Sequence, residues 1–229
     1  MDRRHLLGTL AAGTLGLGLA GHLEAGEAAP APAPTPQPGY TPRPFAFEAG
    51  LPGLSKDLLA EHLALYKGYV GRTSALVKDV LAAETEGKAT PMVQELRRRL
   101  GFEFSGMRLH ELYFEALRDK AGAPGADHPL QKAIRATWGS FDAWWAAFKA
   151  TCVMPGIGWG ALVKDPATGR LMNAWIQDHE NQVAVGTVPL LVVDVWEHAY
   201  VKDYGATARA KYVDAVRPLI DWGVVEKRY

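Results

Sequence analysis

Cysteine is nearly absent from this sequence, which has one, Cys152, among 229 residues. A single thiol excludes an intrachain disulfide and a cysteine-based zinc cluster, so we expect Cys152 to be a small buried side chain. Neither charge is in excess, because 25 lysines and arginines balance 25 aspartates and glutamates. The longest basic run, three arginines at residues 97–99, has no interleaved aromatic residues. We therefore expect no nucleic-acid partner.

Long hydrophobic runs are also missing. The apolar stretch near the N-terminus, residues 8–21, is rich in glycine and shorter than the roughly 20 residues of a membrane span, so we expect no stable membrane anchor. Arg3 and Arg4 precede this stretch, and Gly26-Glu27-Ala28 after it offers small residues for a signal peptidase, as in a twin-arginine export signal. Alternating alanine and proline from residue 29, with prolines up to Pro44, form a polyproline-like spacer. We predict a signal peptide over residues 1–28, a linker over 29–45, and export to the periplasm or the extracellular space.

Two helical patterns follow the spacer. Apolar residues recur at helical spacing over residues 54–83 and again over 91–117, with a glycine- and proline-containing interruption between them. Such a pair predicts an antiparallel helical hairpin, which we place as a domain over residues 46–120. Glycines in the second pattern predict that this helix is broken near Gly101 and Gly106.

The remaining residues, 121–229, predict a C-terminal α/β domain. Aromatic-rich helical patterns over 127–150 precede a β-hairpin over 156–176, a third strand over 188–193 and a helical segment from Tyr204 to the end. The expected fold class is therefore α+β: an N-terminal antiparallel helical hairpin, followed by an α/β part with a three-stranded antiparallel sheet.

Asp194 and His198 follow the third predicted strand and stand four residues apart. An ionised aspartate at the end of a buried strand requires a partner, and a metal ion would also engage the nearby imidazole. The simpler alternative is an aspartate that caps a helix beside a packed histidine. Each arm of the predicted hairpin carries one further histidine among aromatic residues, His62 and His110. These two histidines favour the metal site.

The seven residues from Asp194 to Tyr200, Asp-Val-Trp-Glu-His-Ala-Tyr, closely resemble the C-terminal metal-binding signature of the iron/manganese superoxide dismutases. Residues 54–62 resemble the run that leads to the first ligand histidine of that family, and residues 105–110 resemble the run that leads to the second. Gly-Ile-Gly-Trp at 156–159 is similar to the family's Gly-Ser-Gly-Trp strand. The resemblance extends from about residue 45 to the end of the chain.

The resemblance implies a site for one iron or manganese ion per chain, with four ligands: His62, His110, Asp194 and His198. It also implies a superoxide dismutase, which converts the small anion superoxide to oxygen and hydrogen peroxide and assembles as a homodimer or homotetramer. Two alternatives stay open. One is an exported metal-binding homologue with weak or no dismutase activity. The other has Glu61 in place of His62 as the first ligand, because Tyr69 follows His62 by seven residues where the family has eight.

The same resemblance assigns roles around the ion. Tyr69 and Tyr66 would relay protons and narrow the entrance, and Trp159 would keep the pocket dry. A glutamine in the family hydrogen-bonds the metal-bound solvent and tunes the metal. One of its two usual positions is Gly106 here, which has no side chain to donate. We therefore expect Gln182, in an Asn-Gln pair after the second strand, to be the donor.

Two further expectations concern the surface of the site. Glu197 resembles the residue that reaches across a two-fold interface to a ligand histidine of a second subunit. Because the chain has no net charge, attraction of an anionic substrate requires a local positive field. We expect Arg209 or Lys202 to supply that field.

Overall fold

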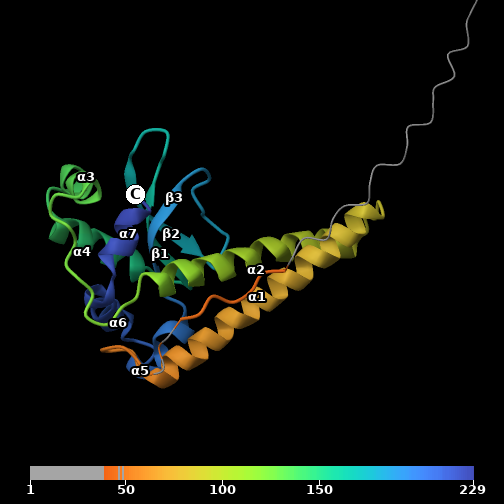
Figure 1. The fold of residues 1–229 in the computed structure, drawn as a ribbon, viewed down its shortest axis with the longest axis horizontal. Helices are drawn as coiled ribbons and strands as arrows, with labels where there is room; N and C mark the ends of the chain where they lie inside the picture. The colour runs from red at the N-terminus through yellow and green to blue at the C-terminus, as the bar shows by residue number, and fades with distance from the viewer. Residues whose placement is uncertain (1–38, 46, 48) are drawn as a thin grey trace, which may run out of the picture. The chain divides into compact units, whose positions relative to one another are not determined.

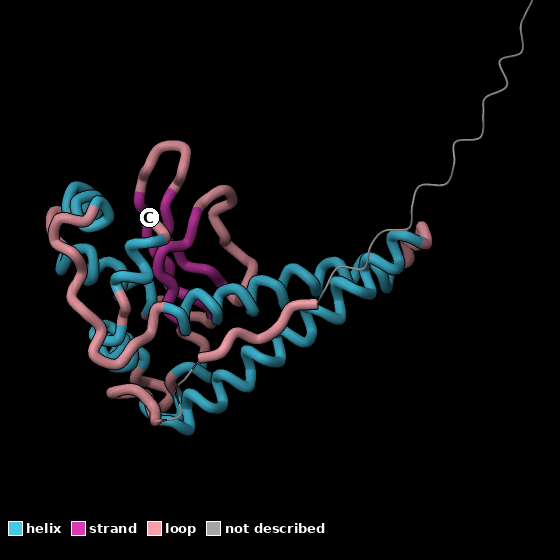
Figure 2. The backbone as a smooth tube through the Cα atoms, in the orientation of Figure 1, coloured by secondary structure: helices cyan, strands magenta, loops and turns pink. Residues whose placement is uncertain are grey.

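The computed structural model describes residues 39–45, 47 and 49–229. The predicted signal peptide, and the predicted linker as far as residue 38, lie outside these residues. Residues 39–45 run as an extended segment beside the helical hairpin (Figure 2). The amide of Tyr40 donates to the hydroxyl of Ser74, and the amide of Arg43 donates to the hydroxyl of Tyr66. Across the described part of the chain, no helix has both the length and the hydropathy required to cross a membrane.

Two long antiparallel helices form the predicted N-terminal hairpin, which is confirmed (Figure 1). Helix α1 spans Lys56–Thr85, and the side chain of Ser55 caps it by accepting from the amide of Leu58. Helix α2 spans Pro91–Glu115, is capped in the same way by Thr90, and has proline at its first position, where no amide donor is needed. Each arm therefore starts at a residue that stabilises a helix N-terminus.

Helix α2 is continuous, so the predicted breaks near Gly101 and Gly106 are wrong. A glycine in a helix interior costs roughly 1 kcal/mol relative to alanine, and tertiary packing of the helix outweighs that cost. At Gly106 the missing side chain is required by the packing. A Cβ atom there would lie 2.7 Å from Cδ1 of Tyr69 on α1. The absence of a side chain thus lets Tyr69 lie directly against α2.

The C-terminal part packs helices against a three-stranded antiparallel sheet, as predicted. Helices α3 (Pro129–Trp138) and α4 (Phe141–Cys152) precede strands β1 (Gly158–Lys164), β2 (Leu171–Gln177) and β3 (Val188–Asp194), in the sheet order β2-β1-β3. Short helical elements complete the chain: η1 (Glu197–Ala199), α5 (Val201–Tyr204), α6 (Arg209–Val216), η2 (Arg217–Leu219) and α7 (Trp222–Lys227).

Strand β1 lies in the middle of the sheet and aligns two residues of the expected site. Its residues are all buried except Lys164 at its end, which explains why the segment consists almost entirely of apolar residues and glycine. Trp159 of β1 pairs in register with Asp194 of β3. The sheet therefore places the indole of Trp159 beside the point where β3 ends.

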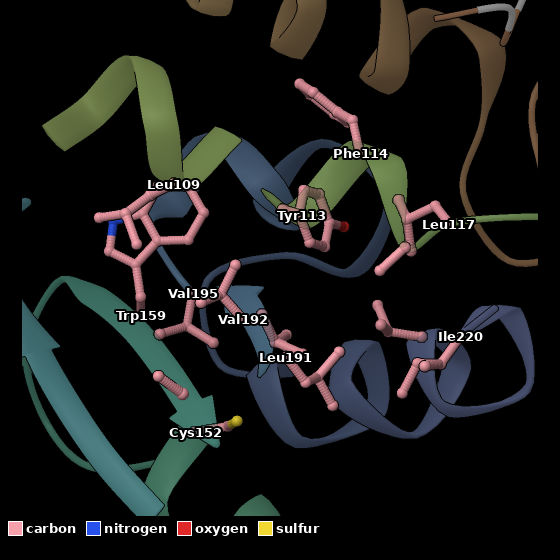
Figure 3. Close-up of a cluster of buried hydrophobic side chains, with 14 of the residues drawn as sticks. Leu109, Tyr113, Phe114, Leu117, Cys152, Trp159, Leu191, Val192, Val195 and Ile220 are labelled. Carbon is pink, nitrogen blue, oxygen red and sulfur yellow. The ribbon is translucent and has the colours of Figure 1, made fainter. Parts of the chain in front are cut away.

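One hydrophobic core joins the hairpin to the sheet. Figure 3 shows side chains of the C-terminal half of α2 facing those of β3 and the segments around it; the labelled residues include Leu109, Tyr113, Leu117, Leu191, Val192, Val195 and Ile220. Because α2 and β3 share this core, a residue on the inner face of α2 comes close to the end of β3. That residue is His110.

Candidate metal centre

Four side chains from four elements meet at the end of β3. His62 comes from α1, His110 from α2, Asp194 from the last position of β3 and His198 from η1, and their ligand atoms all lie within 4.8 Å of one another. Oδ2 of Asp194 lies 3.0 Å from Nε2 of His62, 3.2 Å from Nε2 of His198 and 3.6 Å from Nε2 of His110. Three ring nitrogens therefore converge on one carboxylate oxygen.

Hydrogen bonds outside the cluster orient Asp194. Its Oδ1 accepts from the amide of Trp196 at 2.9 Å, and its main-chain carbonyl accepts from the hydroxyl of Tyr212 at 2.8 Å. The Tyr212 hydroxyl in turn bonds that of Tyr113 on α2 at 2.9 Å. These contacts fix the carboxylate so that Oδ2 points at the imidazoles.

The ring of His110 is held in one tautomer. Its Nδ1 donates to the carbonyl of Gly106 at 2.6 Å, which leaves the lone pair on Nε2. That Nε2 is buried and has no hydrogen-bond partner among the described residues. An unsatisfied buried polar atom costs about 1–3 kcal/mol, and a metal ion would supply the missing partner.

Burial and mutual attraction set the charges of the cluster. Burial lowers the pKa of His62 and places that of His110 well below 6.5, so both rings are neutral. Burial alone would raise the pKa of Asp194, but attraction to His198 and hydrogen bonds to His198 and His62 outweigh it and hold that pKa below its ordinary value. The site thus offers an ionised carboxylate and the neutral imidazoles of His62 and His110, without any thiolate, a donor set that fits iron or manganese.

Aromatic side chains enclose the cluster. The ring centroids of Phe114 and His62 are 4.8 Å apart, and those of Trp159 and His110 are 4.9 Å apart; both pairs pack edge to face. The side chains of His62, His110 and Asp194 are fully buried, whereas that of His198 is 22% exposed. His198 is therefore the residue of the cluster that lies nearest to the surface.

Two of the remaining predicted residues, Trp159 and Tyr69, are linked by His179, which the sequence analysis did not select. The indole Nε1 of Trp159 donates to Nδ1 of His179 at 3.0 Å, so Nε2 carries the proton of the neutral ring and donates to the hydroxyl of Tyr69 at 2.7 Å. Burial lowers the pKa of His179 to about 4 and raises that of Tyr69 to about 12. A Cβ atom on Gly106 would lie 3.1 Å from Cδ2 of His179, so this glycine makes room for both rings.

Gln182 does not reach the cluster. Its side chain is exposed, its φ is 62°, and its Nε2 lies 3.5 Å from Oε1 of Gln177. The side chain of this loop that hydrogen-bonds both Trp159 and Tyr69 is that of His179. His179 could have been selected from its position two residues after the end of β2. The resemblance to an Asn-Gln pair favoured Gln182 instead.

The other expected residues lie at the edge of the cluster. Glu61 points into solvent and pairs with Lys202 at 2.6 Å, so His62 rather than Glu61 faces Asp194. Tyr66 is fully buried, but its hydroxyl donates to Glu111 and accepts from the amide of Arg43. That hydroxyl is therefore occupied away from the four clustered residues.

Two of the expected residues, Glu197 and Arg209, lie outside the cluster. Glu197 is exposed beside His198. The guanidinium of Arg209 lies over the ring of Tyr200, and its Nη1 donates to the carbonyl of Met154 at 2.7 Å.

Comparison with known proteins identifies the family. The chain is 37% identical over 196 residues to a superoxide dismutase [Fe] of Cupriavidus metallidurans, an alignment that covers 83% of this chain and 96% of that protein. The chain belongs to the iron/manganese superoxide dismutases. Residues 126–228 match the family described as "Iron/manganese superoxide dismutases, C-terminal domain". The alignment with this relative also extends beyond that region, into the hairpin.

Relatives named for either metal are found within this dismutase family. A superoxide dismutase [Mn] 2 of Haloferax volcanii is 31% identical over 82% of this chain and 93% of its own length. A superoxide dismutase [Fe] of Tetrahymena pyriformis is 34% identical over 78% of this chain and 93% of its own length. The chain therefore spans nearly the whole length of these dismutases.

Proposed function

We propose that this protein is a superoxide dismutase that uses one iron or manganese ion. The observation that carries the proposal is the convergence of His62, His110, Asp194 and His198 within 4.8 Å, with a buried and unpartnered Nε2 on His110. Similarity to dismutases over more than three quarters of the chain supports the same reaction.

The reaction consumes two superoxide anions and two protons and yields one oxygen and one hydrogen peroxide. When bound, the ion supplies a redox centre that accepts an electron from one superoxide and returns it to another. The chain contributes the environment of that centre. The ionised Asp194 stabilises a cation, and the neutral imidazoles of His62 and His110 add no charge, so the site suits both oxidation states.

The second half of the reaction needs protons, and we assign their handling to the Trp159–His179–Tyr69 chain. Trp159 fixes the tautomer of His179, and His179 donates to the hydroxyl oxygen of Tyr69. The proton of that hydroxyl is then free to be donated elsewhere. Because burial raises the pKa of Tyr69 to about 12, the hydroxyl keeps its proton at neutral pH. We therefore assign His179 the role of positioning the Tyr69 hydroxyl.

Metal content tests the ligand assignment. His110→Ala and Asp194→Ala should each abolish stoichiometric binding of iron or manganese, as measured by elemental analysis of purified protein. His128→Ala is a matched control, because His128 caps α3 through its Nδ1, is not among the four clustered residues and should leave metal content unchanged. Full occupancy in both ligand variants would refute the assignment.

Export and assembly also belong to the proposal. The paired arginines and the proline-rich spacer support export through a twin-arginine signal, which Arg3→Lys with Arg4→Lys should block in a fractionated bacterial host. Exposed Glu197 beside the partly exposed His198 supports a homodimer or homotetramer that covers this side of the site. Light scattering of the processed protein measures its mass, and a monomer would refute the assembly.

A further inference from the structure

Glu103, Arg72 and Arg99 form a charged group beside Tyr69, separate from the four residues of the candidate metal centre. The carboxylate of Glu103 on α2 is fully buried, and it accepts from Nε of Arg72 at 2.7 Å and from Nε of Arg99 at 2.8 Å. The two arginine side chains are 51% and 47% exposed. One buried negative charge therefore holds two positive charges at the surface, and the group carries a net charge of +1.

The two guanidinium groups lie on aromatic rings that lead towards the candidate metal centre. The guanidinium of Arg72 lies 4.7 Å from the centroid of the Tyr69 ring, and the guanidinium of Arg99 lies 4.5 Å from the centroid of the Phe102 ring. The Tyr69 ring is in turn 5.1 Å from the ring of His110. A single aromatic side chain thus separates Arg72 from a residue of the centre.

The position of Arg72 is fixed while its terminal amino groups stay available. Nε is used by Glu103, whereas Nη1 and Nη2 have no hydrogen-bond partner within residues 39–45, 47 and 49–229. Gly68, one turn earlier on α1, gives the guanidinium its space, because a Cβ there would lie 2.9 Å from Nη1. A planar cation with free N–H groups, held in one place by a buried carboxylate, is well suited to contact a small anion.

The cations expected from the sequence are less well suited to this role. Lys202 is paired with Glu61 at 2.6 Å, which cancels its charge locally. Arg209 donates through Nη1 to the carbonyl of Met154. Arg72 instead has both Nη groups free of hydrogen bonds to the described residues and lies over the ring of Tyr69, which packs against His110 of the candidate metal centre.

We infer that Arg72, seated on Tyr69 and anchored by buried Glu103, guides small anions to the candidate metal centre. This inference rests on the proposed function, since superoxide is the anion it concerns. Steering by a local charge raises the association rate at low ionic strength and is lost when salt screens the charge. A residue with only a structural role would not produce that salt dependence.

The test compares three full-chain, metal-loaded variants with the unchanged protein. Arg72→Gln removes the charge but keeps an amide that can donate to Glu103, and Arg72→Lys keeps the charge. Arg97→Gln removes a charge that pairs with Glu84 and is 42% exposed, against 51% for Arg72. We expect Arg72→Gln to lower kcat/KM about threefold to tenfold at ~10 mM ionic strength and less than about twofold at ~0.3 M. Arg72→Lys should restore the salt dependence, and Arg97→Gln should match the unchanged protein.

Azide binding provides a second readout that needs no turnover. Azide is a small anion whose binding is followed by the visible absorption of the metal site, and its dissociation constant should rise in Arg72→Gln and recover in Arg72→Lys. Equal salt dependence and equal azide affinity in all variants would overturn the inference, provided that metal content and melting temperature match. If the unchanged metal-loaded protein is inactive, the proposed function fails, and the azide comparison still decides the role of Arg72.

Discussion

Adding one methyl group at Gly106, whose carbonyl accepts from His110, should disturb the candidate site through the rings of Tyr69 and His179. An ideal Cβ at this position would lie 2.7 Å from Cδ1 and 2.8 Å from Cε1 of Tyr69, and 3.1 Å from Cδ2 of His179. Both rings are buried and cannot move freely. Gly106→Ala must therefore push Tyr69 and His179 apart, or push α2 away from α1, and weaken the 2.7 Å hydrogen bond between the two rings.

Two opposing effects determine how much Gly106→Ala should change the free energy of unfolding. Alanine is favoured over glycine in a helix interior by roughly 1 kcal/mol. Overpacking a buried site costs about 1–3 kcal/mol. Gly106→Ala should therefore lower the free energy of unfolding by up to about 2 kcal/mol, with each kcal/mol seen as a fall of about 2–4 °C in Tm. Gly71→Ala is the matched control on α1, because a Cβ there meets no described atom within 4 Å, and it should raise stability by up to about 1 kcal/mol.

The assay combines thermal unfolding, elemental analysis and superoxide consumption on the same preparations. Gly106→Ala should keep its metal, because neither Tyr69 nor His179 is among the four clustered residues, but its rate should fall by about tenfold or more, as for other supporting residues of metal sites. Gly71→Ala should keep the full rate. If Gly106→Ala is as stable and as active as Gly71→Ala, the packing of Tyr69 and His179 against α2 is not as described.

Three further predictions concern single residues of the site. His179→Ala should lower the rate of superoxide consumption at constant metal content, because the Trp159 indole and the Tyr69 hydroxyl lose their hydrogen-bond partner. Gln182→Ala should change neither the rate nor the metal content. A slower Gln182→Ala beside an unchanged His179→Ala would restore Gln182 as the donor. Glu61→Gln should leave metal content unchanged and His62→Gln should reduce it, as measured by elemental analysis, since only His62 faces Asp194. Burial lowers the pKa of His179 from 6.5 to about 4, so its contribution to stability is complete above pH ~6.5 and is lost as the pH falls towards ~4. In thermal unfolding of the metal-free protein, the melting temperature of His179→Gln should therefore fall less steeply with decreasing pH than that of the unchanged protein.

Much of the fold could be predicted because the sequence carries local signals for it. Ser55 and Thr90 mark the helix starts, and the apolar segment of β1 has the composition of a central strand. The break expected at Gly106 was wrong, because helix propensity is a local quantity while the ring that fills the space belongs to Tyr69 on another helix. Propensity alone therefore did not predict the path of α2.

The candidate site was predictable where chemistry limits the choice and unpredictable where geometry does. Asp194 and His198 share a spacing that suggests a common site, and the structure brings His62 and His110 to them. His179 and Gln182 are three residues apart in one loop, and either side chain could donate a hydrogen bond. Only the direction of the chain after β2 determines which one enters the core, and sequence patterns do not specify that direction.

The most direct test of the central claim is the rate of superoxide consumption per bound metal ion, measured on processed protein whose iron and manganese contents have been determined. The proposed function predicts a rate far above that of the same concentration of free metal ion, and proportional to occupancy across preparations. A metal-replete protein that consumes superoxide no faster than the free ion would contradict the assignment, and would indicate a metal-binding member of the family without dismutase activity.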